Sequence, residues 1–382
     1  MSRDWMATCR GGSHGENPCV TCLLRTLPRA QGPFAMARLR LVVIGASAGG
    51  VEPLRQVISA LPADLPAAVL VVLHVAPYQA SSLPQILARV GKLPAVHPRD
   101  GAKLQAGRIY VAPPDHHMLV EDNHVAVTKG PKENRFRPSI DALFRSAAYT
   151  AGPNTIGVIL SGALDDGTSG LWSVKRMGGV AIVQRPTEAQ MDSMPLSALQ
   201  QVKVDHEVAA GEIGPLLVKL LKAPTRRRPR VPKALERRLG IEVAIAAKNE
   251  AFQKGVLGLG ELTSFTCPEC HGALARIPEL KMARYRCHTG HAYTDSSLLE
   301  GVMEATGELL YQVVRSYEEA VLLLRDMAAH LKAGGDAERA KPFEQKAKDL
   351  QSRSEALHKA MLDHESLSGD NLGQTPRKPG RG

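Results

Sequence analysis

Between residue 39 and about residue 222, short apolar runs alternate with longer segments of mixed polarity. Five of the runs have the composition of β-strands: LRLVVIGAS (39–47), AVLVVLHV (68–75), GRIYVAP (107–113), NTIGVILSG (154–162) and GGVAIVQ (178–184). Helical patterns lie between several of them, at 51–60, 81–90, 139–151 and 167–177. Apolar strands spaced in this way predict an α/β fold, a doubly wound and mostly parallel sheet in a three-layer αβα arrangement. Right-handed crossovers would then place the loops after these strands along one carboxyl edge, where open α/β sheets bind ligands.

The rest of the chain divides into shorter segments of distinct composition. We expect a disordered or incorrectly assigned N-terminal extension at 1–36, followed by the α/β domain at 37–222 and a Pro/Arg-rich linker at 223–235. After the linker we expect a helical segment with a small cysteine-rich module at 236–295. An α-helical hairpin at 296–367 and a disordered tail at 368–382 complete the predicted organisation. The hairpin is predicted because residues 298–331 carry leucine, valine and tyrosine at helical spacing opposite charged positions, and an Ala-Gly-Gly-Asp break at 333–336 divides the segment into two helices.

The net charge of +10 is concentrated near the linker. Seven basic residues stand close to three prolines: Arg226, Arg227, Arg228, Arg230, Lys233, Arg237 and Arg238. Aromatic residues make up only 4% of the chain, so few rings are available to stack on bases, and we expect a solvated linker and no nucleic-acid partner. No apolar run approaches the ~20 residues of a membrane span, so an integral membrane protein is not expected.

The six cysteines form two clusters, at 9–22 and 267–287. No secretory signal precedes them, so the expected location is the reducing cytoplasm, where CxxC pairs indicate metal or redox chemistry rather than disulfides.

A glycine-rich turn with one serine follows the first predicted strand. The sequence VVIGASAGG places Gly45, Ser47 and Gly49 in a G-x-S-x-G arrangement. Between a strand and a helix, this pattern is typical of the nucleophile turn of serine hydrolases, with free helix N–H groups available to a developing oxyanion. The same composition also binds the phosphates of nucleotides. The turn alone leaves both interpretations open.

Two further residues favour the hydrolase. His74 ends the next predicted strand, where an imidazole can deprotonate a serine, whereas a dinucleotide fold would have an acidic residue about 20 positions beyond the glycines. Asp165 and Asp166 follow a later strand; a turn or cap role suits Asp165, and Asp166 is the candidate that orients the imidazole. The order Ser, His, Asp differs from that of α/β-hydrolases, so the scaffold is a different one.

Residues 39–222 resemble the catalytic domain of CheB, the chemotaxis protein-glutamate methylesterase. The matching segments follow in the family's order: VVIGASAGG, VVLHVAP, GRIYVAPPDHHM, RFRPSIDALFRSAA, GVILSGALDDGTSGL and VQRPTEAQMDSMPLSAL. The resemblance implies that Ser47 is the nucleophile, His74 the general base and Asp166 the triad aspartate. It places Ala48, Ala163 and His117 beside the oxyanion or the active site. The family usually has T-G-M-G-x-D-G where this chain has Ser161-Gly162-Ala163-Leu164-Asp165-Asp166-Gly167, so Leu164 replaces a glycine and puts the turn in question.

The implied reaction is two-step acyl transfer that removes methyl esters from glutamate side chains of chemoreceptor-like proteins and releases methanol. Deamidation of glutamines is a further activity implied by the resemblance, and no cofactor is expected for catalysis. About 38 residues precede the first strand, too few for the receiver domain that CheB proteins normally carry, so we expect a receiver-less variant without phosphorelay control in this chain. The alternative is a CheB-like signalling adaptor whose C-terminal half binds a receptor or another signalling partner.

The second cysteine cluster predicts a structural zinc. Cys267-Pro-Glu-Cys270 and Cys287-His-Thr-Gly-His291 form two knuckles, as in zinc ribbons, with Cys267, Cys270, Cys287 and His291 as ligands. His288 and His271 are weaker alternatives for the fourth position. The FTCPEC and RYRCHTGHAYT segments also resemble a C-terminal module found in receiver-less CheB-like proteins. A second group, Cys9, Cys19 and Cys22 with His14, has metal-binding residues but lacks a supporting core.

Overall fold

The computed structural model of the chain describes residues 39–248, 251, 255–279 and 282–362. The expected N-terminal extension, the cysteine cluster at 9–22 and the tail at 368–382 lie outside the described residues.

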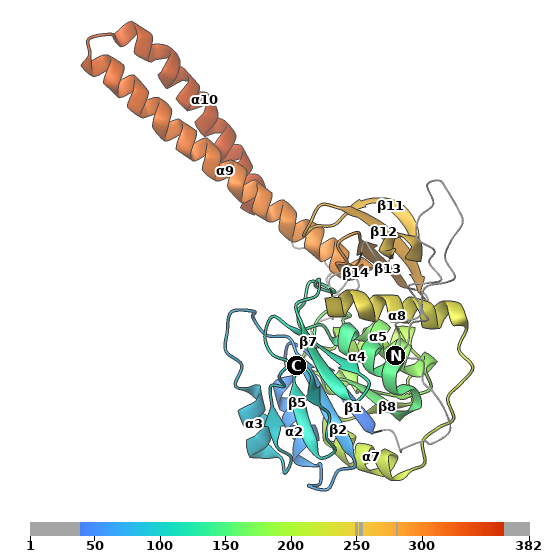
Figure 1. The fold of residues 1–382 in the computed structure, drawn as a ribbon. Helices are drawn as coiled ribbons and strands as arrows, with labels where there is room; N and C mark the ends of the chain where they lie inside the picture. Colours follow the sequence, from blue (N-terminus) through green and yellow to red (C-terminus); the bar gives the residue numbers. More distant parts are fainter. Residues whose placement is uncertain (1–38, 249–250, 252–254, 280–281, 363–382) are drawn as a thin grey trace, which may run out of the picture. The chain divides into compact units, whose positions relative to one another are not determined.

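A seven-stranded sheet forms the centre of the first domain, with strand order β10-β9-β8-β1-β2-β5-β3 and parallel pairing throughout (Figure 1). Its strands are β1 (Arg40–Ala46), β2 (Ala67–Leu73), β3 (Ala95–Val96), β5 (Arg108–Val111), β8 (Thr155–Ile159), β9 (Val180–Gln184) and β10 (His206–Val208). The predicted mostly parallel α/β sheet is therefore confirmed. Because consecutive residues of a strand point to opposite faces and both faces are covered, the central strands β1 and β2 are almost continuously apolar.

Six helices cover the sheet. The first face is packed by α2 (Val51–Ser59), α3 (Leu83–Val90) and α7 (Ala210–Lys222); the second is packed by α4 (Ile140–Ala151), α5 (Thr168–Arg176) and α6 (Ser193–Gln201). Within β1, Val42 and Ile44 belong to the first core and Leu41 and Val43 to the second. Four of these helices start and end within two residues of their predicted ranges. Three 3₁₀ turns are described: η2 (Gly152–Asn154), η3 (Pro186–Glu188) and η4 (Val256–Leu259).

A second, antiparallel sheet was not predicted. It contains β4 (Ala102–Lys103), β6 (His117–Glu121) and β7 (His124–Thr128) in the order β4-β7-β6. The β6–β7 hairpin turns at Asp122, whose φ of 50° is left-handed. An Asp-Asn pair between two apolar runs is a turn signal that sequence reasoning overlooked.

The C-terminal region, residues 233–362, begins with α8 (Lys233–Lys248), which starts inside the stretch expected to be a linker. Two basic residues of that stretch make ion pairs, Arg226 with Asp205 and Arg228 with Glu236, and Arg238 of α8 pairs with Glu279. A four-stranded antiparallel sheet follows, formed in order by β11 (Glu261–Thr266), β12 (Ala273–Glu279), β13 (Met282–Cys287) and β14 (Ala292–Thr294).

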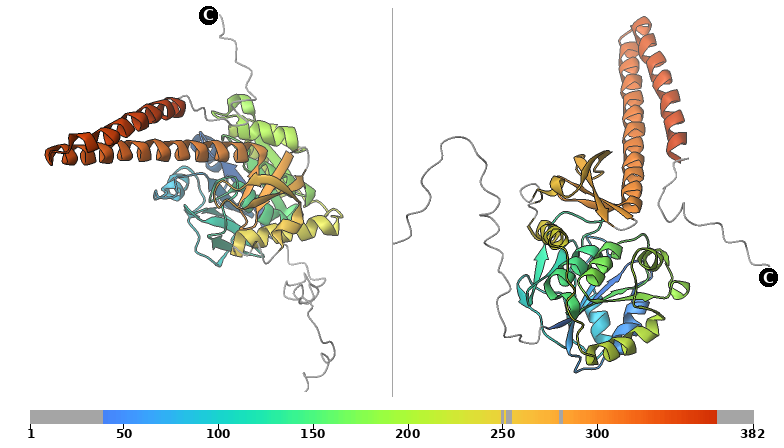
Figure 2. Two further views of the ribbon diagram at one scale, coloured as in Figure 1. Left: turned by 90° about the horizontal axis from the view of Figure 1, so that it is seen from above. Right: turned by 90° about the vertical axis from the view of Figure 1, so that its right-hand side faces the viewer.

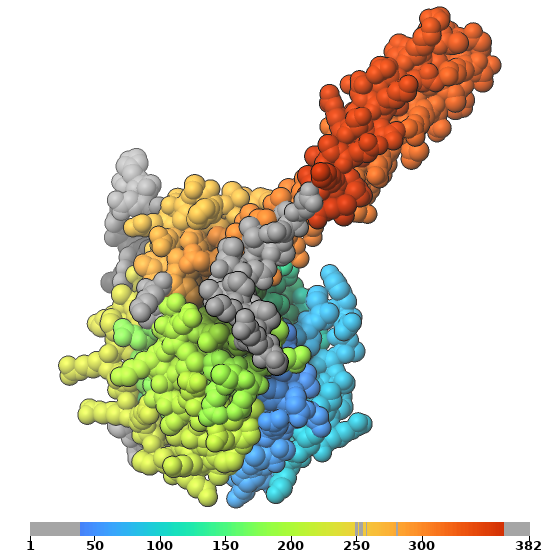
Figure 3. All heavy atoms as spheres, turned by 180° about the vertical axis from the view of Figure 1, so that it is seen from behind, coloured from blue at the N-terminus to red at the C-terminus, as the bar shows by residue number. Residues whose placement is uncertain are grey.

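Two long helices end the described chain. α9 (Asp295–Ala333) and α10 (Ala337–Leu362) lie side by side as a hairpin (Figures 1 and 2), and the space-filling view shows them in contact (Figure 3). Buried residues recur every seven positions on both helices, at Val314, Val321 and Ala328 of α9 and at Ala340, Ala347 and Ser354 of α10. Within the described residues, no helix is both long and apolar enough to cross a membrane.

Candidate active site

Ser47 lies in the turn between β1 and α2, at the carboxyl edge of the parallel sheet. Its backbone N–H donates to Ser161 O at 2.9 Å, which ties this turn to the end of the neighbouring strand β8. Gly49 has a φ of 71°, and a Cβ atom there would come within 2.6 Å of Gln190 Cβ. The tight turn therefore requires this glycine, and it leaves the Ser47 side chain only half-buried.

The side chains of Ser47, His74 and Asp166 are aligned by two hydrogen bonds. His74 Nδ1 lies 3.1 Å from Ser47 Oγ, and His74 Nε2 lies 2.9 Å from Asp166 Oδ2. An ionised carboxylate can only accept, so Nε2 carries the proton and Nδ1 is left to accept the serine hydroxyl proton. The ring of Phe136 stacks on the imidazole, with centroids 3.7 Å apart and planes 10° from parallel. The structure thus brings together the three residues that the sequence singled out.

Asp166 is buried, yet its surroundings favour the charged form. Its carboxylate accepts hydrogen bonds from the backbone N–H groups of Ile140, at 2.7 Å, and Asp141, at 3.2 Å, at the N-terminus of α4. The Ser139 hydroxyl and the Asn134 amide also donate to it, at 3.0 and 2.9 Å. Burial alone would raise the pKa of Asp166, but the hydrogen bonds and the neighbouring His74 hold that pKa below its usual value. Asp166 is therefore an anion able to stabilise an imidazolium.

A second buried carboxyl group, Asp141, lies beside Asp166. Burial, together with the charge of Asp166, raises the pKa of Asp141 to about 8. Its oxygens accept from Gly170 N at 2.6 Å and from the Asn134 side chain at 3.0 Å. Sequence reasoning missed Asp141 and Asn134 as site residues. They lie in or just before the RFRPSIDALFRSAA segment, but no spacing pattern marked either one.

The backbone amides expected beside the oxyanion have no acceptor within the described part of the chain. Neither Ala48 N nor Ala163 N donates to another described protein group, whereas Gly162 N, next to Ala163, donates to Met191 O at 3.0 Å. The residue after Ala163, Leu164, is buried and adopts a left-handed φ of 61°. Leu164 thus takes the backbone conformation for which glycine is best suited. The turn therefore forms even though this chain has leucine where the family usually has glycine.

His117 lies behind the site rather than in it. It is fully buried at the start of β6; its Nδ1 accepts from Ser139 N at 3.3 Å, so Nε2 donates to Pro131 O at 2.9 Å. Burial lowers the pKa of His117, which keeps the ring neutral. Because the Ser139 hydroxyl donates to Asp166, His117 supports the triad aspartate from the far side.

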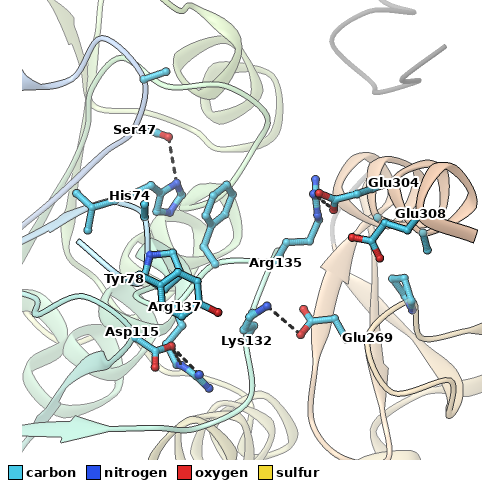
Figure 4. Close-up of a pocket in the computed structure, with 18 residues that line it drawn as sticks. Ser47, His74, Tyr78, Asp115, Lys132, Arg135, Arg137, Glu269, Glu304 and Glu308 are labelled. Atoms are coloured by element: carbon cyan, nitrogen blue, oxygen red, sulfur yellow. Dashed lines mark hydrogen bonds and ion pairs between the residues drawn. The ribbon is translucent and has the colours of Figure 1, made fainter. Parts of the chain in front are cut away.

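A cleft of about 940 Å³ opens over Ser47 and His74, and the C-terminal region forms one of its walls (Figure 4). That wall comprises Pro268 and Glu269 of the small sheet and Gly301, Glu304, Ala305 and Glu308 of α9. Ion pairs cross the cleft: Lys132 Nζ lies 3.2 Å from Glu269, and Arg135 pairs with both Glu300 and Glu304. Sequence reasoning did not predict this wall.

The four candidate metal ligands also come together. Cys267 and Cys270 lie between β11 and β12, Cys287 and His291 between β13 and β14, and their donor atoms are all within 4.8 Å of one another. The alternatives His271 and His288 lie outside this group. Within the small sheet, the three described cysteines are free thiols.

A doubly wound α/β domain that aligns serine, histidine and aspartate at the carboxyl edge of its sheet defines the class of protein as an esterase-like hydrolase. Comparison with known proteins gives the family. The family model described as CheB methylesterase matches residues 42–217. A relative from Leptospira interrogans, provisionally named protein-glutamate methylesterase/protein-glutamine glutaminase, is 34% identical over 47% of this chain and 93% of its own length. The chain belongs to the CheB methylesterase family and is a methylesterase.

Two further relatives extend well beyond the matched region. Protein-glutamate methylesterase/protein-glutamine glutaminase 2 from Rhodospirillum rubrum is 38% identical over 45% of this chain and 49% of its own length. The corresponding protein 3 of Anaeromyxobacter dehalogenans is 38% identical over 51% of this chain and 58% of its own. The crystal structure of the Thermotoga maritima CheB methylesterase catalytic domain is 33% identical, with a TM-score of 0.46, over 48% of this chain and 98% of that one.

Proposed function

We propose that this methylesterase hydrolyses glutamate methyl esters through an acyl-enzyme on Ser47. The alignment of Ser47, His74 and Asp166 carries the proposal. His74 accepts the hydroxyl proton at Nδ1 as Ser47 Oγ attacks the ester carbonyl, and the imidazolium then protonates the departing methoxide, so methanol leaves. Water, deprotonated by His74, next attacks the acyl-enzyme and releases the glutamate.

The tetrahedral oxyanion is held by backbone amides. We assign this role to Ala48 N, next to Ser47, and to Ala163 N, after β8, since neither donates to another described protein group. One such donor contributes about 2.7–4 kcal/mol of transition-state stabilisation. In this mechanism the backbone amides stabilise the oxyanion, and no metal or organic cofactor takes part.

The proposed substrates are methylated glutamates of chemoreceptor-like proteins, since the relatives are named protein-glutamate methylesterases. Those names also include protein-glutamine glutaminase, and the same site can perform that reaction. The Ser47 acyl-enzyme would be identical, with ammonia leaving in place of methanol.

Ser47→Ala tests the proposal directly. We expect methanol release from methylated receptor membranes and hydrolysis of p-nitrophenyl acetate to fall at least a thousand-fold, because the nucleophile is lost. A fluorophosphonate should label the wild type and not the variant. Ser59→Ala, at the exposed end of the helix that follows the nucleophile, is the matched control and should keep full activity. Normal methanol release by Ser47→Ala would refute the mechanism.

We also propose that Cys267, Cys270, Cys287 and His291 hold a structural zinc. Zinc–sulfur bonds of about 2.3 Å in a tetrahedral site place neighbouring ligand atoms about 3.8 Å apart. Cys270 Sγ lies 3.6 Å from Cys287 Sγ, and His291 Nδ1 lies 3.6 Å from both Cys267 Sγ and Cys287 Sγ. Glu269, 3.6 Å from His291 Nε2, would fix the orientation of the ligating ring.

Free thiols in a zinc-binding arrangement favour the reducing cytoplasm as the location.

A second proposed function for the C-terminal region is docking of the substrate. An apolar stripe on α9 is exposed and follows coiled-coil spacing, with members Val302 at 43%, Leu309 at 61%, Val313 at 42%, Leu323 at 63% and Met327 at 48% exposure. The stripe faces away from the buried α10 contact residues and begins beside Gly301 and Ala305, which line the cleft. We propose that a helix of the methylated receptor packs on it and so brings its glutamate esters to Ser47.

Replacing Leu323 and Met327 by glutamate separates docking from chemistry. We expect kcat/KM on receptor membranes to fall about ten-fold and hydrolysis of p-nitrophenyl acetate to stay unchanged, since the small ester needs no docking surface. Glu318→Gln, on another face of α9, is the control. If receptor turnover is unchanged but a wild-type dimer becomes a monomer by light scattering, the stripe is a self-association surface and the docking proposal is wrong.

A further inference from the structure

The segment of residues 132–137 touches the catalytic triad at two points. Asn134 Nδ2 donates to Asp166 Oδ1 at 2.9 Å, and the Phe136 ring stacks on the His74 imidazole. The same segment makes a tight turn in which Glu133 and Phe136 exchange backbone hydrogen bonds of 3.2 and 2.9 Å. This short segment therefore contacts both the base and the carboxylate that orients it.

The turn is conformationally demanding. Its two central residues, Asn134 and Arg135, have φ values of 51° and 71°, as a type I′ turn requires. Asparagine tolerates this region, but an arginine there costs free energy and persists only where the surroundings fix it.

The C-terminal region supplies the fixing contacts. Asn134 N donates to Ala292 O at 2.7 Å, and Ala292 N donates to Lys132 O at 3.2 Å, so the turn is paired with β14. Arg135 pairs with Glu300 and Glu304 of α9, as Figure 4 shows for Glu304. The two central residues of the strained turn are thus held by residues more than 150 positions further along the chain.

A buried ion cluster anchors the same turn. Glu133 accepts from Arg145 of α4 at 2.8 Å and from Arg286 of β13 at 2.8 Å, and all three side chains are almost completely buried. Glu242 of α8 pairs in turn with Arg284, at 2.8 Å, and with Arg286, at 3.3 Å. Breaking a fully buried pair of this kind is strongly unfavourable, so the two regions are joined rigidly at this point.

The last contact reaches the triad itself. Ser297, in the first turn of α9, donates its hydroxyl to Asn134 Oδ1 at 3.3 Å. With its carbonyl engaged in this way, the Asn134 amide points its NH₂ group at Asp141 and Asp166, at 3.0 and 2.9 Å. The reverse amide orientation would place the Asn134 carbonyl oxygen against the ionised Asp166 carboxylate. The Ser297 hydroxyl and the Asp166 carboxylate together favour the orientation of Asn134 that supplies a donor to Asp166.

We infer that the C-terminal region of this chain positions the catalytic triad, with Ser297 acting on Asp166 through the positioning residue Asn134. The inference rests on the proposed Ser47 chemistry and adds a role for the C-terminal region within it. Asn134 and Ser297 do not touch the substrate. They hold the carboxylate that orients His74, while Phe136 of the same segment holds the ring from its face.

A double-mutant cycle tests this coupling. We expect Ser297→Ala and Asn134→Gly each to lower kcat for p-nitrophenyl acetate about ten-fold at unchanged KM, because each weakens or removes the hydrogen bond that Asn134 donates to the charged Asp166. Glycine is chosen at position 134 because it keeps the left-handed φ of 51° while it removes the amide. In the Asn134→Gly background, Ser297→Ala should have no further effect on kcat, because it acts only through Asn134. Ser297→Thr, which keeps the hydroxyl, should restore activity. Ser316→Ala is the matched control, since that α9 hydroxyl bonds only to Gln312 O of its own helix.

The outcomes separate this inference from loss of folding and from failure of the esterase mechanism. Ser297 also caps α9, so thermal unfolding is recorded for every variant at the assay temperature. Independent, multiplicative effects of the two substitutions on kcat would mean separate structural damage and would overturn the inference. Folded variants with wild-type kcat would overturn it as well. A wild type without Ser47-dependent ester hydrolysis would instead refute the proposed function.

Discussion

His74 Nε2 lies 2.9 Å from Asp166 Oδ2, and the same oxygen accepts Ile140 N at 2.7 Å. Asp166 is therefore shared between the base and the N-terminus of α4. Asp166→Asn replaces one of the two carboxylate oxygens by an NH₂ group. Both oxygens accept hydrogen bonds in the wild type, since Oδ1 also accepts several, so in either amide orientation the NH₂ group would face hydrogen-bond donors. We expect kcat for p-nitrophenyl acetate to fall about 10³–10⁴-fold. We also expect lower thermal stability.

Asp165→Asn is the matched control for that substitution. Asp165 precedes Asp166 in the same turn, but its Oδ1 accepts the Thr294 hydroxyl at 2.8 Å, and an amide oxygen can accept that bond equally well. We expect kcat within about three-fold of wild type. Equal losses in the two variants would show that the turn as a whole, rather than the Asp166 carboxylate, supports the base.

The sequence was sufficient to predict the triad because each member follows a parallel strand, and parallel strands bring their carboxyl ends to one edge. The positions of Asn134 and of the cleft wall could not be predicted in this way. Asn134 reaches Ser297 across 163 residues, and the wall depends on how α9 packs against the α/β domain. Such contacts follow from tertiary packing between segments that carry no common motif. The β6–β7 hairpin, by contrast, had a local turn signal and could have been predicted.

Glu242→Gln should destabilise the protein far more than any surface substitution on α8. Glu242 is fully buried and pairs with Arg284 at 2.8 Å and Arg286 at 3.3 Å, so its loss leaves two buried guanidinium groups short of countercharge. We expect a decrease of about 3–5 kcal/mol in the free energy of unfolding, measured by urea titration. Glu236 lies on the same helix as Glu242, and Glu236→Gln removes only its exposed pair with Arg228 of the preceding segment, which should cost under about 1 kcal/mol. Similar costs for both would contradict a buried cluster.

Acid should lower the free energy of unfolding, because it protonates the buried carboxylates of Glu133 and Glu242 in the same ion cluster. Burial opposes the charges of Glu133 and Glu242, but Arg145, Arg284 and Arg286 outweigh it and lower both pKa values, that of Glu242 to about 2. A carboxyl whose folded pKa lies below its unfolded value, about 4.3, stabilises the fold above pH 4.3 and loses that contribution as pH falls toward the folded pKa. We therefore expect the free energy of unfolding to fall steeply between about pH 5 and pH 2. Glu242→Gln should show a shallower fall, and an equal slope would refute the assignment.

Zinc content gives a direct test of the metal site. The purified wild type should contain about one zinc per chain by atomic emission, and Cys267→Ser, which replaces a buried thiolate ligand, should contain almost none. His288→Ala is the matched control, because His288 lies next to Cys287 but outside the ligand group, and it should keep its zinc. Since β14 holds the 132–137 segment, Cys267→Ser should also lower kcat. Full zinc content in Cys267→Ser would refute the ligand set.

Substitutions of Leu164 test whether the leucine in the turn after β8, where the family usually has glycine, impairs the oxyanion site. Its φ of 61° shows that leucine already adopts the conformation that glycine would take, at a steric cost of about 1–2 kcal/mol. Leu164→Gly removes that cost but also deletes a buried side chain, worth about 2–5 kcal/mol, so we expect a net loss of about 1–3 kcal/mol in stability and an unchanged kcat for p-nitrophenyl acetate. Leu164→Val is the contrasting variant, because a β-branched residue fits a left-handed φ poorly and should shift Ala163 N and Asp166, lowering kcat about ten-fold or more. A large rise in kcat for Leu164→Gly would show instead that the leucine holds the Ala163 amide away from the oxyanion.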